Sequence, residues 1–130
     1  MKPKEYLQQY RQSMERTAEI EQHLAELKAE AIRLKDHEGY SVKLDDATAK
    51  YVDACDEMSA ELNRLAALRQ EIKQTIEAVS NARLRSMLTE IYINGQTLVR
   101  IAADKERSYE HICRLHGEAL RRVSEIMRIT

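Results

Sequence analysis

Two neighbouring stretches decide the fold of this chain: Tyr92-Ile93-Asn94-Gly95-Gln96-Thr97-Leu98-Val99-Arg100-Ile101-Ala102-Ala103 and Ser108-Tyr109-Glu110-His111-Ile112-Cys113-Arg114-Leu115-His116. Asn94 and Gly95 tolerate the positive backbone φ angles that end a helix. Thr97 and Ser108 carry side-chain oxygens of the kind that cap the first turn of a helix. The two stretches therefore predict a helix, a tight turn, a short helix, a second turn and a capped helix, which is the layout of a helix-turn-helix motif.

The flanking residues complete a unit of three helices. Ser80 or Asn81 is expected to cap a first helix that runs to about Ile93. Apolar residues recur at spacings of three and four and predict one small core, made of Leu84, Met87, Leu88, Ile91, Leu98, Ile101, Ala102, Ile112, Leu115, Ala119, Leu120, Val123 and Ile126. The side chains left outward on the first turns of the third helix are Tyr109, Glu110, His111, Cys113 and Arg114.

From about Ala82 to Met127, the sequence resembles region four of bacterial sigma factors, in the diverged form found in phage late-gene transcription regulators of the RinA and ArpU type. The matching pieces are Tyr92 to Thr97, Ile101-Ala102 and Arg114 to Arg122. Where such domains often have a glycine in the second turn, this chain has Asp104-Lys105-Glu106-Arg107. The resemblance implies a phage or prophage transcription regulator that binds double-stranded DNA and has RNA polymerase as a possible partner.

The resemblance also assigns roles by position. Tyr109, Glu110, His111 and Arg114 occupy positions of base- or backbone-contacting side chains. Arg114 is the best candidate for a bidentate contact with guanine, and Glu110 is a candidate acceptor for a cytosine amine. Contacts to phosphate are expected from Arg100, Lys105, Arg107 and Arg121. A plain alternative for Arg114 is an ion pair with Glu110 or Glu118, each four residues away on the same helix.

Residues 1–80 predict a long antiparallel helical hairpin, and residues 81–130 the helix-turn-helix unit, so the expected fold class is all-α. The first seam of the hairpin comprises Tyr6, Tyr10, Ser13, Thr17, Ile20, Leu24, Leu27, Ala31 and Leu34, and it is expected to end at Asp36-His37-Glu38-Gly39. The second comprises Leu44, Thr48, Tyr51, Cys55, Met58, Leu62, Leu65, Arg69, Ile72, Ile76 and Val79, and its apolar stripe is broadened by Ala54, Ala66, Leu68 and Thr75. One hairpin cannot bury both stripes completely. Either a second copy pairs with it, which is the favoured reading and makes a homodimer, or the carboxy-terminal unit packs on it.

Charge and composition restrict the function classes. Residues 81–130 carry nine Lys and Arg against six Asp and Glu, whereas residues 1–80 carry twelve against sixteen. The weak basic excess thus lies in the segment that resembles a DNA-binding domain. No apolar run is long enough to span a bilayer and no apolar signal region follows Met1, so no membrane partner and a cytoplasmic location are expected. The two cysteines, Cys55 and Cys113, are expected to be free thiols.

No catalytic pattern is found. The chain has no glycine-rich phosphate loop and no nucleophile elbow, so we expect that it is not an enzyme and has no cofactor. His111, Cys113 and His116 lie close in sequence, but a closed zinc site usually needs four ligands, so no metal site is expected.

Two further function classes remain open. One is an oligomeric structural or packaging adaptor resembling small terminase subunits. The other is a protein-interaction module without sequence-specific DNA binding. The number of subunits distinguishes the adaptor from a regulator, because a regulator is expected to be a monomer or dimer and an adaptor a larger ring.

Overall fold

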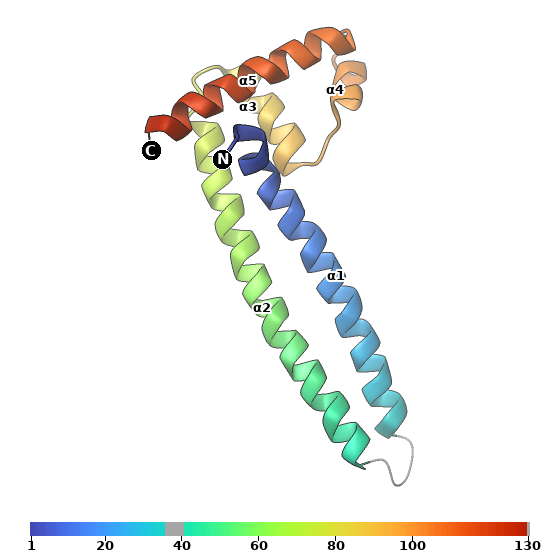
Figure 1. Cartoon of the computed structure of the whole chain (residues 1–130). Coiled ribbons are helices and arrows are strands. Elements are labelled where there is room, and N and C mark those ends of the chain that lie inside the picture. The colour runs from blue at the N-terminus through green and yellow to red at the C-terminus, as the bar shows by residue number, and fades with distance from the viewer. Residues whose placement is uncertain (36–40, 130) are drawn as a thin grey trace. The chain divides into compact units, whose positions relative to one another are not determined.

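The computed structural model describes residues 1–35 and 41–129, and every regular element in these ranges is helical. Two long helices come first, α1 (Pro3–Lys35) and α2 (Ser41–Glu77). They are followed by α3 (Ala82–Leu88), the π-helical segment η1 (Thr89–Ile93), α4 (Leu98–Asp104) and α5 (Tyr109–Ile129). Helices α1 and α2 pack against each other in antiparallel directions (Figure 1). The predicted all-α fold, a helical hairpin followed by a small helical unit, is confirmed.

Helix α1 begins where the sequence favours it. Pro3 occupies the first helical position, where the missing N–H of proline has no helical partner to lose. Arg33 and Lys35 place positive charge in the last turn, at the negative end of the helix dipole. The segment Asp36-His37-Glu38-Gly39, which was expected to end this helix, lies outside the described residues.

The inner face of α2 differs in part from the predicted seam. It consists of Leu44, Ala47, Tyr51, Ala54, Met58, Glu61, Leu65, Leu68 and Ile72, which are buried or half-buried at alternating spacings of three and four. The predicted seam contained every second one of these positions, and its expected broadening included Ala54 and Leu68. The seam also placed Thr48, Leu62 and Arg69 inward, and those three side chains are exposed. Small alanines at positions 47 and 54 allow the two helices to approach closely, which favours this register over one that buries the larger Leu62.

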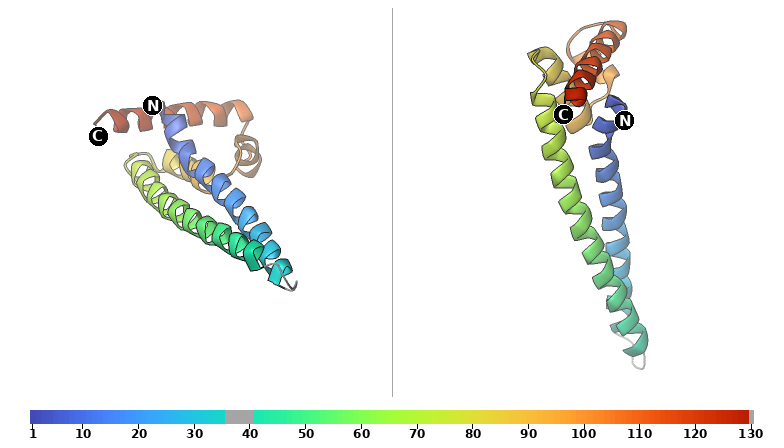
Figure 2. Two further views of the ribbon diagram at one scale, coloured as in Figure 1. Left: turned by 60° about the horizontal axis from the view of Figure 1, so that its bottom comes forward. Right: turned by 60° about the vertical axis from the view of Figure 1, so that its left-hand side comes forward.

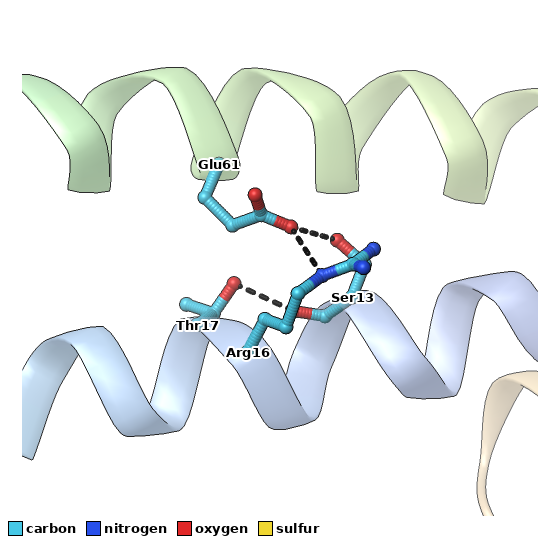
Figure 3. Close-up of polar contacts among 4 residues, drawn as sticks. All are labelled: Ser13, Arg16, Thr17 and Glu61. Carbon is cyan, nitrogen blue, oxygen red and sulfur yellow. Dashed lines mark hydrogen bonds and ion pairs between the residues drawn. The ribbon is translucent and has the colours of Figure 1, made fainter.

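A polar contact inside the hairpin accounts for the inward position of Glu61 (Figure 3). Ser13 on α1 is fully buried, and its hydroxyl donates to Oε1 of Glu61 at 2.8 Å. The same carboxylate oxygen lies 3.4 Å from Nε of Arg16, and Thr17 Oγ1 donates to the Ser13 carbonyl at 2.9 Å. Because a buried hydroxyl without a partner is costly, this contact favours one register of α1 against α2.

The chain divides into two compact units, one formed by Ser13–Leu65 and the other by Met1–Gln12 together with Ala66–Thr130. The second unit therefore contains the first residues of α1 and the last part of α2 as well as α3 to α5. The expected domain boundary at residue 80 is not where the contacts divide the chain. The physical reason is the apolar content of the hairpin ends: Leu7, Ile72 and Ile76 are fully buried within this unit, and two helices alone cannot enclose such side chains.

Helices α3, α4 and α5 share the core that their spacing predicted. Met87, Ile101, Ala102 and Ile112 form its centre, and Ile91, Leu98 and Leu115 pack against them. Asn81 caps α3, its side-chain oxygen accepting from the backbone N–H groups of Arg83 and Leu84. These helices are drawn from two further directions in Figure 2.

The predicted helix to Ile93 changes its hydrogen-bond pattern before it ends. In η1 the Asn94 N–H donates to the Thr89 carbonyl at 3.0 Å, five residues back rather than four. Gly95 then adopts a φ of 76°, and the Gln96 N–H donates to the Glu90 carbonyl at 2.8 Å. Glycine suits this position because a side chain there would strain the backbone. Tyr92, within η1, is buried.

Candidate nucleic-acid interface

The two helices after the Asn94-Gly95 turn both begin with a side-chain cap. Thr97 Oγ1 accepts from the Arg100 N–H at 3.1 Å, and Ser108 Oγ accepts from the His111 N–H at 3.1 Å. Thr97 and Ser108 are the two residues that the sequence analysis expected as caps. Each satisfies an amide that the first helical turn otherwise leaves without a partner. The caps thereby determine where α4 and α5 start.

The turn between α4 and α5 is closed by a pair of backbone hydrogen bonds. The Arg107 N–H donates to the Ala102 carbonyl at 3.0 Å, and the Glu106 N–H donates to the Ala103 carbonyl at 3.3 Å. This is the Schellman arrangement of a helix end, which needs a left-handed residue directly after the cap. Glu106 supplies it with a φ of 54°. The second turn therefore forms without the glycine that sigma-like domains often have there. The left-handed conformation of Glu106 instead carries some backbone strain, because it is a residue with a side chain.

Helix α5 presents a mixed polar surface on its first two turns. Tyr109 is 53% exposed, and Glu110 and Arg114 are also exposed. His111 and Cys113 are half-buried, so these two are less accessible than the sequence analysis expected. The side chain of Cys113, one turn along the helix, raises the pKa of Tyr109 above its ordinary value through a hydrogen bond. On the opposite face, Ile112 is fully buried in the core.

The ion pairs of α5 show whether Arg114 is paired with a carboxylate on its own helix. Glu118 pairs with Arg122 at 3.7 Å, and Arg114 makes no ion pair with any described residue. The alternative in which Arg114 pairs with Glu110 or Glu118 is therefore not the arrangement found. Arg114 keeps its guanidinium available to an external group.

The four residues expected to contact phosphate are all exposed, but they differ in their neighbours. Arg100 pairs with Asp104 on the same helix at 3.5 Å, and the Lys105 ammonium lies 4.0 Å from Glu90. Arg107 and Arg121 are exposed and make no ion pair within the described ranges. Exposed pairs of this kind contribute little to stability, so they leave Arg100 and Lys105 able to exchange partners.

His116 is held by an aromatic partner. Its Nε2 lies 2.7 Å from the hydroxyl oxygen of Tyr92, and the two rings stack with centroids 5.9 Å apart. Burial raises the pKa of Tyr92 to about 12. Burial also lowers the pKa of His116, and the nearby positive charge of Lys4 lowers it further. In the described part of the chain, no three His, Cys, Asp or Glu side chains are grouped as metal ligands would be.

Arg83 was not among the site residues expected from the sequence. The structure brings this residue of α3 to the rim of a depression of about 330 Å³ that Lys105, Arg107 and His111 also line. Met87, Ile112 and Leu115 form the apolar part of the lining. The sequence contained one usable signal, since Arg83 lies four residues before the core residue Met87 and so near the same face of α3. Its proximity to residues 105–111, however, depends on how α3 and α5 pack.

The arrangement offers guanidinium donors, a carboxylate acceptor and an aromatic ring on one exposed helix start, beside additional basic side chains. None of the helices in the described ranges is both long and apolar enough to cross a membrane. Comparisons of the chain with protein-family models, with curated proteins and with solved structures found no match.

Proposed function

We propose that this chain binds duplex DNA through the helix-turn-helix formed by α4, the following turn and α5, and that it is a transcription regulator of the phage or prophage type. The observation that carries the proposal is the start of α5. A capped helix exposes Tyr109, Glu110 and Arg114 on one side and is anchored in a core by Ile112 on the other. A rigid helix presented in this way is of the size that enters the major groove.

Side-chain chemistry supports a base-contacting role for Arg114. The guanidinium is exposed and is not paired with a carboxylate in the described structure. A planar guanidinium matches the two acceptors of guanine in the major groove. Glu110, one turn earlier, offers the complementary acceptor for a cytosine amine.

Charge supports contact with the DNA backbone around this helix. Arg107 and Lys105 flank the turn before α5, Arg100 lies on α4, and Arg121 lies further along α5. Contacts from such residues position a protein on DNA without reading its sequence. The acidic side chains of Asp104 and Glu90, which lie against Arg100 and Lys105, reduce this attraction and predict modest affinity for non-specific DNA.

The proposal includes a homodimer that associates through the hairpin. Ile32, Val52 and Leu62 are between 45% and 55% exposed on α1 and α2, and association of two hairpins would cover apolar side chains of this kind. A dimer would read two half-sites and increase the sequence information that is recognised. RNA polymerase is the further partner that the resemblance to sigma region four implies.

The experiment that tests the proposal is selection of random duplexes by the full chain at about 0.15 M salt, where non-specific phosphate attraction is partly screened. We expect an enriched motif, and an inverted repeat within it would support the dimer. The matched control is a Glu110→Ala/Arg114→Ala double variant, which keeps the core of α5 and should enrich a different motif or none. Absence of enrichment with the unchanged chain would contradict sequence-specific binding.

The exposed apolar residues of the hairpin also favour a second candidate function, an oligomeric packaging adaptor. Sedimentation of the full chain distinguishes the two functions, because a regulator should sediment as a monomer or dimer. An assembly of about eight or more subunits would favour the adaptor over the regulator.

A further inference from the structure

The depression between α3 and α5 combines features of a small-molecule site. Its volume of about 330 Å³ falls in the lower range of ligand pockets. Its apolar lining comes from the core: Met87 and Ile112 are almost completely buried, and Leu115 packs against them. All of its walls belong to the same compact unit.

The polar rim of the depression is cationic. Arg83, Lys105 and Arg107 contribute three positive charges from two separate elements, α3 and the turn before α5, and His111 completes the rim. No acidic residue is among the lining residues in the described part of the chain. Only Lys105 has a carboxylate close to it, Glu90 at 4.0 Å, so the guanidinium groups of Arg83 and Arg107 have no ion-pair partner among the described residues.

We propose that this depression binds a small amphipathic anion, an organic molecule with a carboxylate, sulfonate or phosphate group attached to an apolar body. Guanidinium groups bind such oxyanions in a bidentate manner. The half-buried side chain of Leu115 leaves apolar surface open in the depression, and covering that surface with a hydrocarbon or aromatic body is favourable. A bare inorganic anion uses only the rim and leaves the open surface of Leu115 in contact with water, which is why the amphipathic class fits better.

Binding of such an anion has a consequence for DNA, which rests on the proposed function. Lys105 and Arg107 serve both the depression and the proposed phosphate contacts. An anion in the depression therefore neutralises charge that the duplex would otherwise use, and it should weaken DNA binding. The depression would then be an effector site.

The test uses the fluorescent probe 1-anilinonaphthalene-8-sulfonate with the full chain. We expect saturable fluorescence enhancement at one probe per chain. Arg83→Gln and Arg107→Gln should each weaken probe binding about fivefold, since each removes a charge-assisted contact. Arg83→Lys, which keeps the charge and loses the planar fork, should weaken it by less. The matched control is Arg69→Gln, an exposed arginine of α2 outside the depression, which should leave probe affinity unchanged.

Competition separates an amphipathic site from a simple basic patch. We expect 2-naphthoate to displace the probe, and sodium sulfate at the same ionic strength to leave most of it bound. Equal displacement by sulfate, or unchanged probe binding in Arg83→Gln and Arg107→Gln that remain helical by circular dichroism, would overturn the proposal. The effect on DNA is measured separately: 2-naphthoate should weaken duplex binding by the unchanged chain more than by Arg83→Gln. A third outcome is that probe binding depends on both arginines but 2-naphthoate does not alter duplex affinity. That outcome would support the anion site and refute its competition with DNA.

Discussion

The hydroxyl oxygen of Tyr92 and Nε2 of His116 are hydrogen-bonded at 2.7 Å, although the two residues are 24 positions apart. Tyr92 lies in η1 and His116 in α5, so the contact joins the end of the first helix of the three-helix unit to its last helix. His116 is three residues beyond Cys113, on the same helix that carries the proposed DNA contacts. The pair therefore helps to hold α5 in place, and its loss should lower stability and weaken the proposed DNA binding.

Replacing Tyr92 by Phe should destabilise the fold. The variant keeps the buried ring but loses the hydrogen bond and leaves the imidazole nitrogen without its partner, at a cost of about 1–2 kcal/mol. Urea unfolding measured by circular dichroism gives this free energy. The matched control is Tyr109→Phe, because Tyr109 is exposed and its variant should change stability by less than about 0.5 kcal/mol. Equal effects in the two variants would show that the contact does not contribute.

Stability should depend on pH through His116. Burial lowers the pKa of His116 in the folded state below its ordinary value of 6.5. Between the folded-state pKa and 6.5, the unfolded chain binds a proton that the folded chain does not bind, so acid favours unfolding. The stabilising contribution is complete above pH 6.5 and is lost as the pH falls through the folded-state pKa. Urea midpoints between about pH 5 and pH 8 measure this loss. His116→Gln, which cannot titrate, should show a shallower decline below pH 6.5, and identical profiles would refute the prediction.

Glu106→Gly should stabilise the chain. The native φ of 54° strains a residue with a side chain, whereas glycine adopts it freely. Because glycine also loses more conformational entropy on folding, we expect a net gain of about 0.5–1 kcal/mol. Thermal or urea unfolding measures it. The control is Glu125→Gly in the exposed face of α5, which should instead lose about 1 kcal/mol. A loss at position 106 as well would mean that the side chain of Glu106 has a stabilising role.

Ser13→Ala tests the polar contact inside the hairpin. The buried hydroxyl donates to Glu61, and its removal should cost about 1–2 kcal/mol. A double-mutant cycle with Glu61→Ala should give a coupling energy of about 1 kcal/mol, since both variants remove the same hydrogen bond. Ser59→Ala, at an exposed position of the same hairpin, is the control and should have little effect. Additive effects of the variants at 13 and 61 would show that this contact does not determine the register.

If the chain binds DNA as proposed, Arg114→Ala should alter its preference for DNA sequence and leave the fold intact. We expect the variant to distinguish the bases less well at one position of the DNA site, with a loss of about 1–3 kcal/mol in the difference of binding free energy between the correct and a wrong base. Lys105→Ala should instead weaken binding to all duplexes and reduce the salt dependence by about one unit of slope. Binding selections and titrations at several salt concentrations separate these effects. Unchanged sequence preference in Arg114→Ala at matched salt would remove Arg114 from the base-contacting residues.

The starts and ends of the short helices were predictable from sequence, because caps and turns act over a few residues. Asn81, Thr97 and Ser108 cap the helices that follow them, and Gly95 takes the left-handed conformation. The left-handed residue of the second turn was not predictable in this way. The residues of that turn include no glycine, and only the backbone angles identify Glu106 as the one that accepts the strain. The π-helical pattern of η1 likewise left no signal in the spacing of apolar residues.

The site residues on α4, on α5 and in the turn between them were predicted from the sequence, whereas Arg83 on α3 was missed. Tyr109, Glu110 and Arg114 were expected outward because the apolar positions of α5 leave them there, and they are exposed. Arg83 was not selected, because its spacing of four residues from Met87 indicates only a face of α3 and not a neighbour on another helix. Its position beside Lys105 and Arg107 results from the packing of α3 against α5.

The sequence by itself determined the helices, the caps of the short ones and the apolar faces of α3, α4 and α5, since these depend on spacing and on neighbours within one or two turns. The tertiary structure decided the features that depend on contacts between distant residues. It placed Ala47 and Glu61 on the inner face of α2 in place of Thr48 and Leu62, and it grouped the ends of the hairpin with α3 to α5. It also brought Tyr92 to His116. The physical reason is that adjacent heptad lines and alternative groupings bury similar apolar area, so the choice among them rests on side-chain fit and on the pairing of buried polar groups.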